Sequence, residues 1–246
     1  MNYDIPIRYL ARAWYEQPPK LTNPRILGQV SEVLGVEFEL TSILRFDSYT
    51  GVGGPTSTLV SRETGWQLVA APDSIDLERH ALRHAEKTPS EETLRKVGEA
   101  MAVIASASSV PAHRLALVQE GFLREMSEAE LTGAATQLLR FPKTFQPAPF
   151  EWDWRCVQRV PRTFAGLAEE TNAVAIVKRV AGTFLDDGNS IPFDRIRVDI
   201  DLNTSPHNET PRFTQAHVQA FYNDATGWHA QLSEELGPCV GIGGQA

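Results

Sequence analysis

The stretch from Phe193 to Asn203 constrains the fold most, because polar and apolar residues alternate along it. One set of alternate positions holds Ile196, Val198, Ile200 and Leu202, and the other holds Arg195, Arg197, Asp199 and Asp201. A period of two is typical of a β-strand with one buried and one open face. The chain therefore contains a sheet that is covered on one side, and the open side carries charge.

The rest of the chain predicts strands followed by helices. Strands are expected at about 3–15, 36–46, 56–61, 66–71, 114–123, 151–160 and 173–180, and helices at about 24–34, 74–85, 90–104, 127–139 and 214–236. Clustered strands followed by helices favour an α+β fold with largely antiparallel sheets over a doubly wound parallel fold.

Helix ends are marked by local signals. Asn23 followed by Pro24 is a typical helix start, and Gly35 is suited to the position after the helix. Ser127 with Glu130 forms the pattern of a capping box. Gly237-Pro238 predicts the end of the long C-terminal helix.

The segment 141–150 contains three prolines and is the best candidate for a linker. We therefore expect two sheet-plus-helix halves, residues 1–145 and 146–246, with mostly antiparallel strands. The long C-terminal helix follows the strands of the second half, and the halves are expected to pack as one unit.

Composition narrows the class of protein. The 246 residues carry a formal net charge of -8, which makes nucleic-acid binding unlikely because such surfaces are usually basic. The two cysteines are too few for a disulfide framework. Residues 1–10 lack the apolar core of a signal peptide, and no run approaches the roughly 20 apolar residues of a membrane span. We expect a cytoplasmic protein.

Asp199 and Asp201 are candidate catalytic residues, because both point to the same side of one strand. Such a pair binds a divalent cation or raises the pKa of one carboxyl group, and His207 lies just beyond the strand. The alternative is that Arg195 and Arg197 join the two carboxylates in cross-strand pairs on a solvated face.

Asp76, His80 and His84 are weak candidates for a metal site. Within the helix expected at 74–85 they lie on one stripe, a spacing that suits metal ligands. No HExxH motif accompanies them, and an exposed polar stripe is the simpler interpretation. The glycine clusters at 51–54 and 241–244 lack nucleotide-binding spacings, so the sequence predicts no cofactor.

Trp152 and Trp154 are candidate binding residues, together with Arg195 and Arg197. Phe150, Trp152 and Trp154 alternate with charged residues, and aromatic side chains on one strand face stack on planar ligands or form binding hot spots. The same residues equally suit the hydrophobic core of the second half.

The chain resembles a sporadically distributed bacterial family of similar length and no assigned function. The resemblance is carried by 61–68 with Pro72-Asp73, by the strand 197–201, and by the helix that contains His217, Phe221 and Leu232. It spans most of the chain and implies no reaction and no catalytic residues.

These observations favour a binding or interaction protein. Its expected partner is a protein or a second copy of itself, as in a homodimer, and a small-molecule ligand is a further option. A defence, antitoxin-type or assembly-accessory role suits an acidic protein that masks a basic partner. The alternative is a metal- or carboxylate-dependent enzyme that acts on a small molecule near Asp199, Asp201 and His207.

Overall fold

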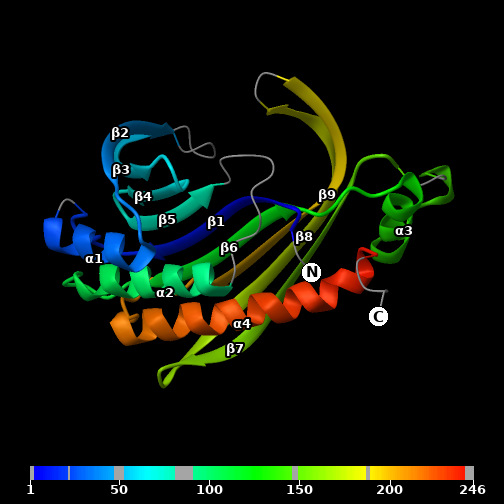
Figure 1. The fold of residues 1–246 in the computed structure, drawn as a ribbon. Helices are drawn as coiled ribbons and strands as arrows, with labels where there is room; N and C mark the ends of the chain where they lie inside the picture. The colour runs from blue at the N-terminus through cyan, green and yellow to red at the C-terminus, as the bar shows by residue number, and fades with distance from the viewer. Residues whose placement is uncertain are drawn as a thin grey trace.

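In the residues that the structure describes, the chain forms one nine-stranded sheet with four α-helices (Figure 1). The computed structural model describes residues 3–21, 23–46, 53–80, 91–145, 149–186 and 189–241. The strands are β1 (Ile5–Trp14), β2 (Glu39–Phe46), β3 (Gly53–Ser61), β4 (Trp66–Ala70), β5 (Ser74–His80), β6 (Arg114–Phe122), β7 (Trp152–Phe164), β8 (Leu167–Asp186) and β9 (Asn189–Thr204). The helices are α1 (Pro24–Leu34), α2 (Glu91–Ser106), α3 (Glu128–Leu138) and α4 (Gln215–Cys239), with a short 3-10 helix η1 (Lys143–Phe145). This is the predicted α+β fold with a long C-terminal helix.

The strands lie in the order β2-β3-β4-β5-β1-β6-β9-β8-β7, and all neighbours are antiparallel. Strands from residues 1–145 occupy one side of the sheet and strands from residues 146–246 the other. They meet where β6 pairs with β9. The division predicted near residue 145 therefore falls within one continuous sheet.

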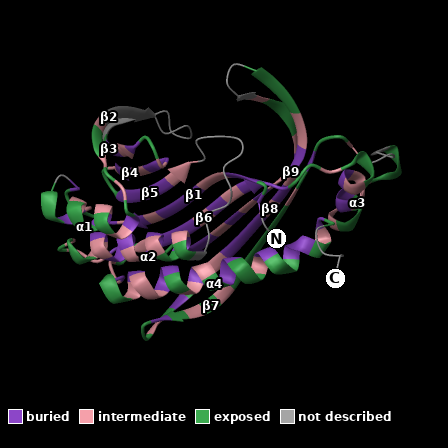
Figure 2. Ribbon diagram, viewed as in Figure 1, coloured by how far each residue is buried: buried purple, intermediate pink, exposed green. Residues whose placement is uncertain are grey.

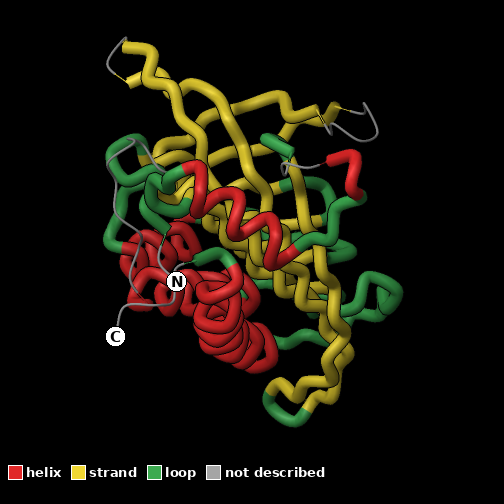
Figure 3. Tube along the Cα trace, turned by 90° about the vertical axis from the view of Figure 1, so that its right-hand side faces the viewer, coloured by secondary structure: helices red, strands yellow, loops and turns green. Residues whose placement is uncertain are grey.

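Helices α1, α2 and α4 cover one face of this sheet, as Figures 1 and 3 show from two directions. The alternation of polar and apolar residues along β9 explains this layer. The apolar residues of β9 are completely buried on the helix side, namely Ile196, Val198, Ile200 and Leu202. From α4, Phe221 meets Phe164 of β7 edge to face, with ring centroids 5.3 Å apart. Apolar burial of this kind is the main favourable term that holds the two layers together.

Helices α2 and α4 approach closely at Gly98. A Cβ atom placed on Gly98 would lie 2.9 Å from the Cβ of Tyr222 in α4, so this contact requires glycine. The hydroxyl of Tyr222 donates a hydrogen bond of 3.0 Å to the carbonyl oxygen of Arg12 in β1. Tyr222 thus fixes α4 against both α2 and the centre of the sheet.

The local signals for helix ends are confirmed in three places. The side chain of Asn23 accepts from the Arg25 N–H, and Gly35 adopts the left-handed conformation at the end of α1. Ser127 and Glu130 form a reciprocal capping box at the start of α3. These signals work because they satisfy backbone groups that a helix end leaves unpaired.

Two predictions about local structure are wrong. The helix expected from residue 74 is strand β5, which ends at His80 in the described part of the chain. Its apolar residues Ile75 and Leu77 pair with Ala13 and Ala11 of β1, so tertiary pairing decides the conformation. Helix α4 also continues through Gly237-Pro238 to Cys239, since a proline in the last turn removes a single hydrogen bond.

The β8–β9 arm, residues 181–194 apart from the undescribed turn, projects from the sheet in Figure 1 and is largely exposed in Figure 2. Its base is fixed by Arg179, whose side chain is 5% exposed. Arg179 donates two hydrogen bonds to Asp194 and two to Glu128 at the start of α3. One buried cation thereby joins the arm to a helix.

Candidate functional site

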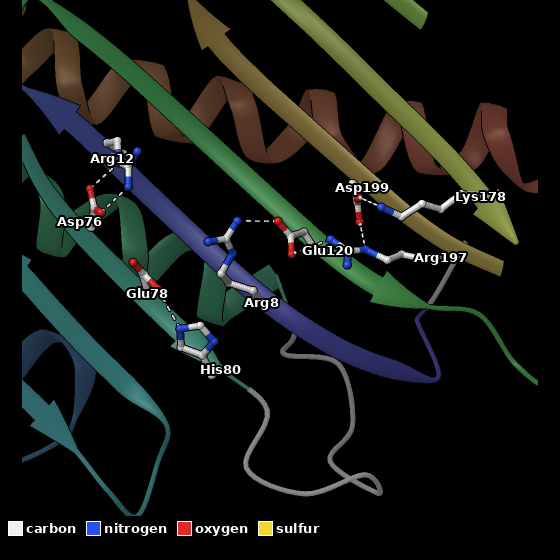
Figure 4. A network of polar contacts seen from close by, with 9 residues as sticks. All are labelled: Arg8, Arg12, Asp76, Glu78, His80, Glu120, Lys178, Arg197 and Asp199. Atoms are coloured by element: carbon white, nitrogen blue, oxygen red, sulfur yellow. Dashed lines mark hydrogen bonds and ion pairs between the residues drawn. The ribbon is translucent and has the colours of Figure 1, made fainter. Parts of the chain in front are cut away.

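The face of the sheet opposite the helices gathers charged residues from β5, β1, β6, β9 and β8 (Figure 4). The register explains the gathering. Arg8 lies opposite His80 on one side and Glu120 on the other, and Glu120 lies opposite Asp199. Residues directly opposite in an antiparallel sheet share a face and lie within reach of each other.

These residues form a chain of contacts that we call the open-face network. Glu120 accepts from Arg8 at 2.5 Å and from Arg197 at 3.0 Å, and it thus bridges two strands. Arg197 also donates to Asp199 at 2.6 Å, and Lys178 lies 3.6 Å from the same carboxylate. Cations and carboxylates alternate along the network, so each charge has an opposite neighbour.

Arg12 and Asp76 form a second, separate pair on this face. The Nε and Nη2 atoms of Arg12 each donate to one oxygen of Asp76 at 2.5 Å. Asp76 is 2% exposed, so its carboxylate depends on this bidentate bond. Burial acts to lower the pKa of Arg12, but the hydrogen bond to Asp76 together with the charges of Asp76, Glu78 and Asp73 outweighs burial, and the pKa is raised.

One corner of the open face is built differently, and we call Arg12, Trp14, Arg114, Asp201 and Asn203 the Trp14–Arg114 corner. The guanidinium carbon of Arg114 lies 4.4 Å from the centre of the Trp14 ring, and that of Arg12 lies 5.4 Å from it. The side chain of Arg114 makes no hydrogen bond to the described residues, and its Nε is buried without a partner. Burial lowers the pKa of Arg114, and the nearby charge of Asp201 offsets only part of this loss of hydration.

The two carboxylates predicted as a pair have different environments. Asp199 is bound by Arg197 and lies near Lys178. Burial raises the pKa of Asp201, although Asn203 donates to it at 3.0 Å and Arg114 acts in the same lowering direction. Asp199 is therefore held in ion pairs, whereas Asp201 is a buried carboxylate whose one side-chain hydrogen bond to the described residues comes from Asn203.

The structure does not bring His207 into contact with this pair. Its backbone N–H donates to Ser205 in the loop after β9, and its side chain bonds to none of the described residues. Within the described ranges, no three His, Cys, Asp or Glu side chains converge to hold a metal ion. For Arg197 and Asp199, the geometry agrees with the alternative of cross-strand pairs on an open face.

The second candidate metal set is rearranged because its helix is strand β5. Asp76 is bound by Arg12, and His80 lies 2.8 Å from Glu78. His84 lies outside the described residues. Asp76 and His80 are thus engaged with neighbours of their own sheet.

The residues predicted to bind a partner are mostly internal. Trp152 is 6% exposed and belongs to the hydrophobic core, and Trp154 packs against that core half-buried. Arg195 is 3% exposed and donates to Asp4, to Glu125 and to the carbonyl oxygen of Leu123. Arg197 belongs to the open-face network. A binding role for these residues stays a prediction.

Sequence reasoning missed the β1 side of the site. Arg8 and Arg12 lie on the open face (Figure 4), and Trp14 follows Arg12 two positions later on the same strand. In β6, Glu120 lies opposite Arg8 and Arg114 lies opposite Trp14. Arg8, Arg12 and Trp14 are separated by two or four residues, and this spacing in the sequence indicates that they share one face of a strand. A bulge between Pro6 and Arg8 and the unknown strand order concealed their neighbours.

No family model matches this sequence, and a search of curated proteins finds no significant match. Membership of the bacterial family that the chain resembles therefore stays a prediction. In the part of the chain that the structure describes, no helix combines the length and apolar character needed to cross a bilayer.

Proposed function

We propose that this is a binding protein that takes an anionic group of its ligand, a carboxylate or a phosphate, at the Trp14–Arg114 corner. The observation that carries the proposal is Arg114. It is half-buried and stacked on Trp14, and it has no hydrogen-bond partner among the described residues. Arg8, Arg12, Arg197 and Lys178 each form an ion pair on this face, whereas Arg114 forms none with the described residues and feels the carboxylate of Asp201 only through its charge.

The energetics favour an anion at this position. A desolvated guanidinium without a partner is costly, and a charge-assisted hydrogen bond restores about 1.5–3 kcal/mol. Trp14 holds the guanidinium plane by a cation–π contact, so the side chain is already ordered before a ligand arrives. Arg12 is fixed by Asp76 and adds positive potential beside the site.

The corner also specifies what should lie next to the anion. Asp201, with its raised pKa, accepts a hydrogen bond when ionised and donates one when protonated. Its carboxyl is held by Asn203, which is itself held by Asn172 at 3.1 Å. We therefore expect a ligand that carries a polar group beside its anionic group.

The test is a thermal-shift and calorimetric titration with two probes, inorganic phosphate and succinate. At least one probe should raise the melting temperature of the wild-type protein, and Arg114→Gln should abolish the shift. Arg162→Gln is the matched control, because Arg162 also stacks on a tryptophan, Trp228 at 4.1 Å, but is paired with Asp224. An equal shift in Arg114→Gln, or no shift of the wild type at millimolar probe, contradicts the proposal.

One observation favours the second candidate, an enzyme that uses a carboxylate. Burial raises the pKa of Asp201, which suits a general acid or base. A ligand identified by native mass spectrometry should then be converted by the wild type and bound without conversion by Asp201→Asn. Binding without conversion by the wild type rejects the enzyme. The expected cytoplasmic location and a defence, antitoxin-type or assembly role stay predictions.

A further inference from the structure

Strand β7 is the last strand of the sheet and has an open edge. It pairs with β8 along its whole length, and no described residue pairs with its other side. The residues from Arg155 to Arg159 are exposed at every position, on both faces of the strand. An open edge presents unpaired N–H and C=O groups that another strand can bind.

The turn of the β7–β8 hairpin shows which backbone groups are free. Ala165 and Gly166 have φ angles of 48° and 90°, which defines a two-residue turn of the type that closes on a hydrogen-bonded pair, here Phe164 and Leu167. Hydrogen-bonded positions alternate along an antiparallel strand, so the even-numbered residues of β7 bond to β8 through their backbone N–H and C=O groups. The odd-numbered residues direct these groups outward, toward the open edge. Pro161, which has no N–H, falls in the outward set, as expected at an edge.

We infer that β7 pairs with β7 of a second copy of this chain, antiparallel, about a two-fold axis at Cys156. In this register Asp153 of each copy lies opposite Arg159 of the other, which gives two ion pairs. Cys156 lies opposite its own counterpart, and the pairing extends from Trp152 to Val160. Pro161 lies immediately outside the paired segment, so no N–H is missing from the new ladder.

Other registers are worse matched. A centre at Val157 places Arg155 opposite Arg159 on both sides of the axis, and like charges directly opposite destabilise a sheet. A centre at Trp154 keeps two ion pairs, between Asp153 and Arg155, but shortens the ladder to the first part of β7 because the strand begins at Trp152. A centre at Gln158 brings Pro161 into the ladder opposite Arg155. The charge pattern therefore favours the pairing register that is centred on Cys156.

The inference is separate from the proposed anion binding, and its tests leave the Trp14–Arg114 corner unchanged. The first is the mass of the full chain in solution by light scattering and sedimentation at tens of micromolar. The wild type should be a dimer. Arg159→Glu should raise the dimer dissociation constant about tenfold or more, because it replaces two attractive pairs with two repulsive ones.

A charge swap separates a lost interface from a misfolded chain. Arg159 also lies 3.7 Å from Glu170, an exposed contact within the same chain. Asp153→Arg combined with Arg159→Asp keeps opposite charges across the axis and should restore the dimer that Arg159→Glu weakens. A monomeric wild type, or a dimer that Arg159→Glu leaves unchanged, overturns the inference.

The second test measures the register by cross-linking. Opposite residues at a rung without hydrogen bonds have Cα atoms about 4.5 Å apart, a distance that a disulfide spans. In a Cys239→Ser background, diamide should accept two electrons and two protons from the two Cys156 thiols and leave one disulfide between the copies. The covalent dimer should be absent from Cys156→Ser. Failure of Cys156 to cross-link a dimeric protein overturns this register.

Discussion

Replacement of Gly98 by alanine should separate helices α2 and α4. The new Cβ would lie 2.9 Å from the Cβ of Tyr222, closer than such atoms approach. The Tyr222 Cβ is attached to the α4 backbone, and the hydroxyl of the same residue is held by the Arg12 carbonyl oxygen. The contact is therefore relieved only by a shift of one helix away from the other.

Two opposing terms set the magnitude. Glycine to alanine inside a helix gains about 0.8–1 kcal/mol of helix propensity. Overpacking at a tight contact costs about 1–3 kcal/mol. Gly227, exposed on α4, isolates the first term, because a Cβ placed there meets no atom within 4 Å. Gly98→Ala should thus be about 1–3 kcal/mol less stable than Gly227→Ala, and Gly227→Ala should be more stable than the wild type.

The measurement is urea unfolding of the wild type and the two variants, with the slope of the transition compared among them. For a chain of this length, 1 kcal/mol corresponds to about 2–4 °C in Tm, so the expected difference is resolved by either method. If Gly98→Ala is as stable as Gly227→Ala, helices α2 and α4 do not approach as closely as the structure places them, and the packing argument fails.

Two further variants test buried polar groups. Burial lowers the pKa of His229 from 6.5 to about 4, so between these pH values the unfolded chain binds a proton that the folded chain does not. The free energy of unfolding should therefore rise by about 3 kcal/mol from pH 4 to pH 6.5. His229→Gln should remove this pH dependence. An unchanged pH profile in the variant contradicts the role of His229. Tyr222→Phe should cost about 1–2 kcal/mol, because it removes the buried hydrogen bond to Arg12. The control is Tyr15→Phe, since the buried hydroxyl of Tyr15 has no hydrogen-bond partner among the described residues and its loss should cost nothing; equal losses in the two variants would reject the role of the bond.

The parts of the fold that local chemistry decides are readable from the sequence. The start of α1 at Asn23-Pro24 and the capping box of α3 depend on residues a few positions apart. Strand β5 is different, because Asp76 and Glu78 are polar residues that are nearly completely buried. Arg12, far away in the chain, provides the partner that makes the burial of Asp76 tolerable. No pattern within β5 contains that information.

The same limit applies to the candidate site. The alternation in β9 identifies Arg197 and Asp199 as members of an open face. Their partners, Glu120 and Lys178, follow only from the register of β9 with β6 and β8. Arg114 is the proposed anion-binding residue because its side chain has no hydrogen-bond partner among the described residues, and this property exists only in the folded protein.

The position of β9 beside β6 also has a consequence for synthesis of the chain. Strand β6 ends at Phe122, whereas β9 begins at Asn189 and α4 follows it. While the chain emerges from the ribosome, the outer edge of β6 stays unpaired and the buried side chains of Leu115 and Leu117 lack their final cover until the last quarter is made. A fragment that stops at residue 145 should therefore aggregate. The pairing of β6 with β9 joins residues far apart in the sequence, so we expect it to form late in folding.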